Sequence, residues 1–249
     1  MCQEKCIELK RNFFDKFNLR IPLWLHGQHA IAVHMKRLNS LIFAYFLCLN
    51  FAYGAEIGVG GVDSPGCDKL ANESHYISLS LIGKIEPGDS EKIERRIHEI
   101  EQPKAIRLRV GMLKLSSPGG DLAEAMRIGR LLRSRQISTF VTSDASCASA
   151  CVFILAAGVS RIAFGPVVIH SFFVPGLLGS GEYAKTSKIL DKAVSDSDAY
   201  FREMRVSRTL LDAMLQVQHS DAKELSIEEL SAFGLVGRDP AYVQSFPKK

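Results

Sequence analysis

The sequence predicts an α/β fold in which strands and helices alternate along the chain. Residues 76–82 and 105–115 alternate apolar and polar side chains, which is typical of strands. Residues 90–101 and 121–135 repeat apolar side chains at the three-to-four spacing of amphipathic helices. Such alternation favours right-handed βαβ connections and parallel strands. With 249 residues, 47% of them hydrophobic, the chain can bury one substantial core.

The turns between these segments carry their own signals. Residues 83–87 contain glycine and proline and end the first strand, and Gly111 predicts a bulge or a close backbone approach in the second strand. A Ser-Pro-Gly-Gly turn follows at residues 117–120, and Asp121 is placed to cap the next helix.

The rest of the chain continues the alternation. A third strand is expected at 138–142, and residues 149–157 predict a small apolar helix that ends at Gly158. The segments expected after it are strands at 161–164 and 167–170 and helices at 181–205, 209–217 and 227–233.

The N-terminal part of the chain has the layout of an export signal. Met35-Lys36-Arg37 begins a basic region, residues 41–51 form an apolar core, and Ala52-Tyr53-Gly54 places small residues where a signal peptidase recognises them. The apolar core is shorter than the roughly 20 residues of a transmembrane helix. We therefore expect a signal peptide at 35–54 and a periplasmic or secreted protein. An uncleaved signal that anchors the protein in the membrane is the alternative.

This layout divides the chain into expected segments. Because a signal peptide normally begins a chain, we expect Met35 to be the true start and residues 1–34 to be a non-native or unprocessed extension. The other expected segments are an irregular lead-in at 55–75, a single α/β domain at 76–240 and a frayed tail at 241–249.

The charge distribution argues against nucleic-acid binding. The formal net charge is +4, but residues 1–54 hold seven Lys/Arg and three Asp/Glu, which leaves 24 basic and 24 acidic residues in the rest. A nucleic-acid-binding domain needs a basic face or stripe. We therefore expect no nucleic-acid partner.

Three cysteines follow the signal, namely Cys67, Cys147 and Cys151. Exported proteins usually fold in an oxidising compartment, so one disulfide with a free thiol, or an intermolecular bond, is expected. A bridge from Cys67 to either of the others and a local bridge between Cys147 and Cys151 remain open. Two cysteines four residues apart, without a matching ligand pair, do not indicate zinc. We expect no metal and no cofactor.

The stretch from Cys147 to Cys151 offers a candidate nucleophile in Ser149. Ser149 is expected at the start of the small apolar helix, where free amides and the helix dipole favour negative charge. The alanines on either side leave room for a substrate. A serine hydroxyl needs a base to become nucleophilic, and without one Ser149 is an ordinary N-cap.

Other groups can complete such a site. Amides of the turn at Gly119 can point at an oxyanion, and each such donor contributes about 3 kcal/mol to the transition state. His170, at a strand end, is the best candidate base, and Asp221 is the best candidate to orient it. His219 is a weaker alternative to Asp221. Each group also has a structural explanation, as an ordinary turn, a hydrogen-bonded histidine or a solvated aspartate.

Together these pieces resemble the Clp protease proteolytic subunit and its exported relatives in the ClpP/crotonase superfamily. The resemblance covers about residues 76–240, and its pieces keep the family's order. Residues 115–120 resemble the family's strand that ends in a serine-proline-diglycine turn, and residues 148–150 with 153–158 resemble its nucleophile helix. Residues 161–164 with 168–170 resemble the strand pair that carries the histidine, and residues 225–236 resemble the segment that follows the aspartate.

The resemblance implies a single domain of repeated ββα units and a serine endopeptidase-like hydrolase. It assigns Ser149 as the nucleophile, His170 as the general base and Asp221 as the orienting acid. The amides of Gly119 and Ala150 are the implied oxyanion hole. The resemblance further implies an ATP-independent enzyme that cleaves peptides or unfolded protein and forms a homo-oligomer.

The chain departs from the family in a shorter segment between Ser149 and His170, and Asp221 is one position off a gapless alignment. Three other functions remain open. They are a Ser/Lys peptidase, a crotonase-type acyl transferase or hydrolase, and a catalytically silent binding or scaffold protein. The lysines considered for the first are Lys185, Lys188 and Lys192.

Overall fold

The computed structural model describes residues 54–63, 75–102, 108–172, 183–218 and 221–244. All of them belong to one unit, which comprises residues 54–65 and 71–249. The expected extension at 1–34 and the expected signal peptide, apart from Gly54, lie outside the described residues. Cys67 and His219 lie outside them as well.

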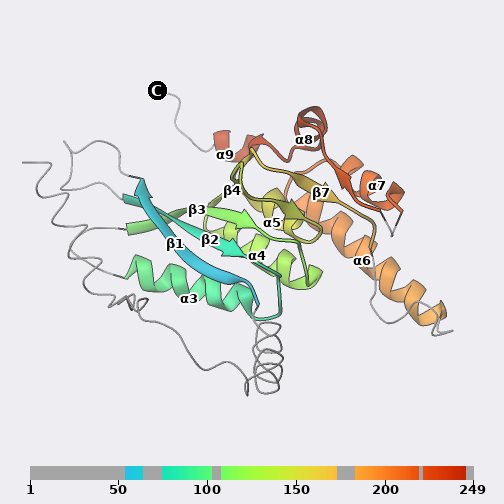
Figure 1. The fold of residues 1–249 in the computed structure, drawn as a ribbon, viewed down its shortest axis with the longest axis horizontal. Coiled ribbons are helices and arrows are strands. Elements are labelled where there is room, and N and C mark those ends of the chain that lie inside the picture. The colour runs from blue at the N-terminus through green and yellow to red at the C-terminus, as the bar shows by residue number, and fades with distance from the viewer. Residues whose placement is uncertain (1–53, 64–74, 103–107, 173–182, 219–220, 245–249) are drawn as a thin grey trace, which may run out of the picture. The chain divides into compact units, whose positions relative to one another are not determined.

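A mixed six-stranded sheet is the centre of the fold (Figure 1). The strand order is β1-β2-β3-β4-β6-β9, and β2, β3, β4 and β6 run parallel to one another. The edge strands β1 and β9 pair antiparallel with their neighbours. In the order of pairing, the strands span Glu56–Asp63, His75–Ile82, Leu108–Ser116, Ser138–Val141, Ser160–Ala163 and Gly237–Arg238.

Helices connect the parallel strands, as the alternation predicted. Helix α3 (Asp89–Glu101) follows β2, α4 (Leu122–Ser134) follows β3, and α5 (Cys151–Ala157) precedes β6. Helix α3 packs against α4, and α4 packs against α5. The prediction that Asp121 caps α4 is confirmed, because its carboxylate accepts the Glu124 N–H at 2.7 Å.

A second sheet of three strands has the order β5-β7-β8. Strand β5 (Cys147–Ala148) pairs parallel with β7 (Val167–Ile169), and β8 (Lys223–Glu224) pairs antiparallel with β7. The chain passes through β4, β5 and α5 and then through β6, β7 and α6. In both runs the first strand, β4 or β6, belongs to the main sheet, and the second strand, β5 or β7, belongs to the small sheet.

Helix α5 is enclosed by the core, and all seven of its residues are buried. Its Phe153 stacks on Phe201 of α6 (Tyr183–Glu203), with ring centroids 4.5 Å apart. Tyr200 of α6 donates its hydroxyl hydrogen to the Phe153 carbonyl at 2.8 Å. These contacts anchor α5 to α6 through Phe153. The remaining helices are α7 (Thr209–Gln216), α8 (Ile227–Phe233) and α9 (Pro240–Gln244).

Arg161 of β6 is 4% exposed and joins the segments that follow three helices. Its guanidinium donates to the carbonyls of Gly158 at 3.0 Å, Met204 at 2.6 Å and Gly234. These carbonyls follow α5, α6 and α8. Burial lowers the pKa of Arg161 to about 10, although Asp239, 3.7 Å away, favours the charged form.

The prediction of an irregular lead-in at 55–75 is wrong for its first part, because β1 spans Glu56–Asp63 and extends the main sheet. Glycines in this segment lower its strand propensity and so conceal the strand. The structure requires them: a Cβ on Gly60 would come within 2.2 Å of the Ser78 hydroxyl on β2. Strands β5, β8 and β9 have two residues each, too few to show a periodicity.

Within the described residues, no helix combines the length and apolar composition needed to cross a bilayer.

Candidate active site

Ser149 lies on a strained turn between β5 and α5. Its φ of +56° is in the left-handed region, which costs a residue with a side chain about 1–2 kcal/mol. The Ser149 N–H donates to the Val168 carbonyl at 2.9 Å, and its carbonyl accepts the Val152 N–H at 3.0 Å. These hydrogen bonds hold the residue on both sides. In α/β-hydrolases the nucleophilic serine occupies a strained strand-to-helix turn of this kind.

The expectation that Ser149 begins the helix is wrong. Helix α5 begins at Cys151 with Ala150 as its N-cap, and no side chain caps this end. Ser149 therefore lies one residue before the cap, which removes its ordinary explanation as a capping serine. Its hydroxyl makes no hydrogen bond to another described residue. The sterically disfavoured turn is thus not explained by a capping role.

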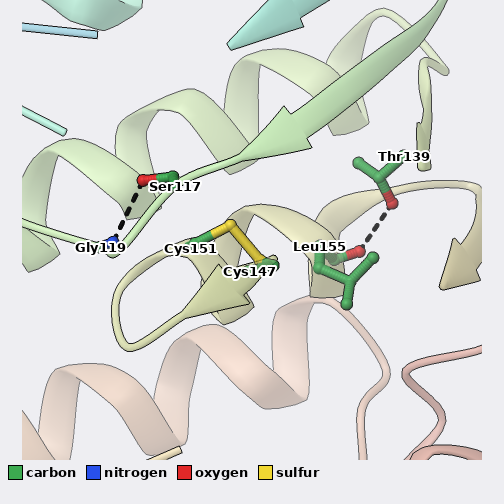
Figure 2. The surroundings of a disulfide bond; sticks show 6 residues. All are labelled: Ser117, Gly119, Thr139, Cys147, Cys151 and Leu155. Atoms are coloured by element: carbon green, nitrogen blue, oxygen red, sulfur yellow. Dashed lines mark hydrogen bonds between the residues drawn. A yellow bond between two sulfur atoms is a disulfide. The ribbon is translucent and has the colours of Figure 1, made fainter. Parts of the chain in front are cut away.

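A disulfide between Cys147 and Cys151 closes a small ring around this turn (Figure 2). The two Cα atoms are 5.3 Å apart, and both residues are fully buried. Of the pairings left open by the sequence, the structure contains the local one. A disulfide ring of this size stabilises the fold by about 2 kcal/mol, because it reduces the conformational entropy of the unfolded chain. It also ties the start of β5 to the first residue of α5.

Gly119 lies directly against the Ser149 turn. A Cβ built on Gly119 would come within 2.6 Å of the Ser149 Cβ and 2.9 Å of the Ala150 nitrogen. Ser117 brings this segment into place, because it forms a parallel bridge with Cys147, and Figure 2 shows Ser117 and Gly119 beside the disulfide. The two backbone segments expected to form an oxyanion hole are therefore neighbours.

The two predicted oxyanion donors differ in their hydrogen bonds. The Gly119 N–H donates to the Ser117 hydroxyl at 3.1 Å, and Ser117 is 2% exposed. The Ala150 N–H has no acceptor among the described residues. An oxyanion at Ser149 would therefore meet one free donor and one that shares its hydrogen with Ser117. The role of Ser117 was not predicted, although a serine two residues before a glycine is typical of a local side-chain-to-backbone turn.

His170 follows β7 directly. In the parallel pairing of β5 with β7, Ala148 lies opposite Val168, so Ser149 and His170 leave adjacent strands at the same end of the small sheet. The Nδ1 atom of His170 lies 2.6 Å from the Ser171 carbonyl oxygen. Because a carbonyl can only accept, Nδ1 carries the hydrogen and Nε2 of the neutral ring is an acceptor. This is the tautomer that a general base needs.

Among the described residues, the Ser149 hydroxyl and the His170 imidazole make no direct hydrogen bond to each other. The structure brings their strand ends together without a direct hydrogen bond between the two side chains. Catalytic hydrogen bonds are often long before substrate binds and tighten in the reacting complex.

Asp221 lies at the same end of the small sheet. Strand β8 runs antiparallel to β7 with Lys223 opposite Ile169, so the residues before β8 lie beside those that follow β7. Asp221 is two residues before β8 and is exposed. All three predicted triad members thus lie next to the same edge of one sheet. The acceptor that the structure gives to His170 Nδ1 is the Ser171 carbonyl.

The lysines of α6 receive no support as a base. A lysine base must be desolvated to lose its proton near neutral pH. Lys192 is 74% exposed and pairs with Asp196 at 2.7 Å, and Lys188 is exposed. The side chain of Lys185 lies outside the described residues.

Two further features of the described residues bear on ligands. No group of three His, Cys, Asp or Glu side chains is placed to hold a metal ion in this part of the chain. A shallow cavity of about 330 Å³ is lined by residues of α4, α6 and α9 and of the segments beside them, among them Arg133 and Asp239, and contains no predicted site residue. Arg133 donates to Asp239 at 2.5 Å, so these two charges satisfy each other.

Comparison with known proteins adds no identification: no protein-family model matches the chain, and no curated protein matches it.

Proposed function

We propose that this protein is a serine peptidase of the ClpP/crotonase superfamily that cleaves peptide bonds through an acyl-enzyme on Ser149. The observation that supports this most is the gathering of Ser149, His170 and Asp221 at one edge of the small sheet. Gly119 packs against Ser149 at the same place. The two successive runs β4-β5-α5 and β6-β7-α6 support the repeated ββα units of that superfamily.

In the proposed reaction, Nε2 of His170 takes the hydroxyl proton of Ser149 as the oxygen attacks the peptide carbonyl. The resulting oxyanion accepts hydrogen bonds from the amides of Ala150 and Gly119. His170 then gives its proton to the leaving amine, and Ser149 carries an ester. A water molecule, deprotonated by the same imidazole, hydrolyses the ester and regenerates the hydroxyl.

The proposed setting is an oxidising compartment outside the cytoplasm. The export signal at 35–54 and the Cys147–Cys151 disulfide both support it. No ATP-driven unfoldase is expected there, so the proposed substrates are peptides and unfolded segments. A signal that stays uncleaved would instead keep the enzyme at the membrane.

Self-association is a further part of the proposal. Phe164, in the connection between β6 and β7, is 73% exposed and meets Phe140 edge-on at 5.6 Å. Exposed aromatic side chains of this kind are enriched at protein interfaces. Light scattering on the purified protein should give a mass of at least two chains, and a monomer across the accessible concentration range would contradict this part.

The test of the proposed function is covalent labelling with a fluorophosphonate probe. Folded protein should be labelled, and mass spectrometry should place the label on Ser149. Ser149→Ala and His170→Ala should abolish labelling, whereas Ser146→Ala, at an exposed serine just before β5, should not. Absence of labelling in folded protein, or labelling that survives Ser149→Ala, would favour a catalytically silent protein with this fold.

A further inference from the structure

Asp89 is a fully buried carboxylate in the first turn of α3. Its Oδ2 accepts the N–H of Ala55 at 3.1 Å and the N–H of Glu86 at 2.9 Å. Its Oδ1 accepts from the Lys92 ammonium at 2.7 Å. The N-terminal end of a helix favours such a negative charge. The contact with Ala55 spans 34 residues of sequence and joins the start of β1 to α3.

Ala55 is 3% exposed and follows Gly54, the last residue of the expected signal peptide. Gly54 lies against the same carboxylate, since a Cβ on it would be 2.9 Å from Asp89 Oδ1 and 3.2 Å from the Lys92 nitrogen. The peptide bond that a signal peptidase is expected to cut therefore lies beside a buried negative charge. The nitrogen released by that cut is already a hydrogen-bond donor to it.

We propose that cleavage between Gly54 and Ala55 creates an α-ammonium group on Ala55 that forms a buried ion pair with Asp89. A signal peptidase of the export machinery supplies the catalysis and water is the co-reactant. The C–N bond breaks, the hydroxyl of water goes to the Gly54 carbonyl carbon, and hydrogen goes to the Ala55 nitrogen. A proton from solvent then completes the ammonium. This inference rests on the proposed export and not on the proposed peptidase activity.

The local geometry favours this pair over the hydrogen bond of the uncut chain. The hydrogen bond of the uncut chain already involves the Asp89 carboxylate, so the cut adds the attraction between an ammonium group and that carboxylate at hydrogen-bond distance. A buried ammonium is tolerated where a carboxylate lies at hydrogen-bond distance, and Asp89 lies at that distance without any rearrangement of β1. Because Ala55 is buried in the fold, the cut must precede folding. The ion pair then forms as β1 joins β2.

The test begins with the N-terminus of the exported protein. The full chain and the chain that begins at Met35 are expressed in a bacterium with an export pathway, and the purified products are sequenced from the N-terminus. We expect Ala55 as the first residue. The protein is then treated with an acetylating reagent at neutral pH, and the N-terminal peptide is quantified by mass spectrometry. The Ala55 amine should react at least about tenfold more slowly in folded than in urea-unfolded protein.

Two variants assign the protection to the ion pair. Asp89→Asn should remove the protection, whereas Asp196→Asn, at an exposed acid paired with Lys192, should leave it unchanged. If Asp89→Asn does not fold, the pH dependence of acetylation of the folded wild-type protein decides, because an ion pair with Asp89 raises the pKa of the Ala55 amine whereas burial alone lowers it. Recovery with the signal attached would overturn this inference, and the location of that product, at the membrane or in the cytoplasm, would decide export separately. An Ala55 amine that reacts equally fast in both states would overturn the ion pair while export stands, and probe labelling of Ser149 decides the peptidase separately.

Discussion

Gly119 lies so close to Ser149 that a Cβ on Gly119 would come within 2.6 Å of the Ser149 Cβ. Both residues have positive φ angles, +97° for Gly119 and +56° for Ser149. Position 119 has no space for a side chain, and Ser149 carries a side chain on a backbone conformation that is disfavoured for it. The turn after β3 and the turn before α5 therefore form a single structural unit around the candidate nucleophile.

Gly119→Ala should displace the Ser149 turn and one oxyanion donor. Loss of a donor typically lowers a rate about 10²- to 10³-fold, so we expect at least a hundredfold slower probe labelling of Ser149. The matched control is Gly237→Ala, because Gly237 has a φ of +104° with no atom within 4 Å of an added Cβ. That variant should lose about 1–2 kcal/mol of stability through backbone strain and keep its labelling rate. Equal labelling of Gly119→Ala and wild-type protein would contradict the site.

Loss of the Cys147–Cys151 disulfide should lower the melting temperature. The ring contributes about 2 kcal/mol, which corresponds to about 4–8 °C for a domain of this size. Cys147→Ala with Cys151→Ala should melt at the lower temperature with or without a reducing agent. Since both cysteines are fully buried, the folded wild-type protein should be reduced slowly at low temperature. A reduced wild-type protein that melts like the oxidised one would show that the disulfide does not stabilise the turn.

Asp221→Asn should have a small effect on the labelling rate. In this structure the hydrogen on His170 Nδ1 is donated to the Ser171 carbonyl, which already selects the tautomer of a general base. We therefore expect less than about a tenfold loss, against the roughly 10⁴-fold loss seen where an aspartate alone orients the histidine. The labelling rate of His170→Ala is the reference for complete loss of the general base. A loss near that of His170→Ala would establish Asp221 as the third member of a triad.

The stability of the protein should fall in acid partly through Glu124, which is fully buried. Burial raises the pKa of this carboxyl, but hydrogen bonds from Ser90 and Arg127 outweigh burial and hold it below its ordinary value. A carboxyl group whose pKa is lowered by folding stabilises the folded protein at pH values above its pKa in the unfolded chain, which is about 4.3. This contribution is lost as the pH falls through the lower pKa of the same group in the folded protein.

Glu124→Gln should therefore lower the melting temperature at pH 7 and make its decline below about pH 4.5 less steep. Thermal melts between pH 3 and pH 7 measure both effects. Glu203→Gln, at an exposed acid paired with Arg130, is the control and should follow the wild-type profile. A Glu124→Gln profile parallel to that of the wild type would refute the assignment.

Arg161→Met should destabilise the fold strongly. The substitution leaves Asp239 with one buried cation fewer and deprives three carbonyls of a donor. Breaking a buried pair of this kind costs about 3–5 kcal/mol, which urea unfolding measures directly. Arg96→Met, at an exposed arginine paired with Glu99, should change stability by less than about 1 kcal/mol. Similar losses in both variants would contradict the structural role of Arg161.

The sequence alone determined the alternation of strands and helices, because the spacing of apolar side chains follows the period at which each kind of element buries them. The helix expected at 227–233 coincides with α8, and those expected at 90–101 and 121–135 match α3 and α4 to within one residue at each end. The cap at Asp121 and the strand end at His170 were predictable for the same local reason.

The tertiary structure decided what depends on residues far apart in the chain. The positive φ of Ser149 is held by Val168, the choice of Gly119 is dictated by contact with Ser149, and β1 exists because its glycines fit against β2. The cysteine pairing that the sequence left open likewise follows from the turn between β5 and α5. The spacing of apolar side chains predicts which side chains are buried. The features above depend instead on which atoms lie in contact with each residue, and only the folded chain brings those atoms together.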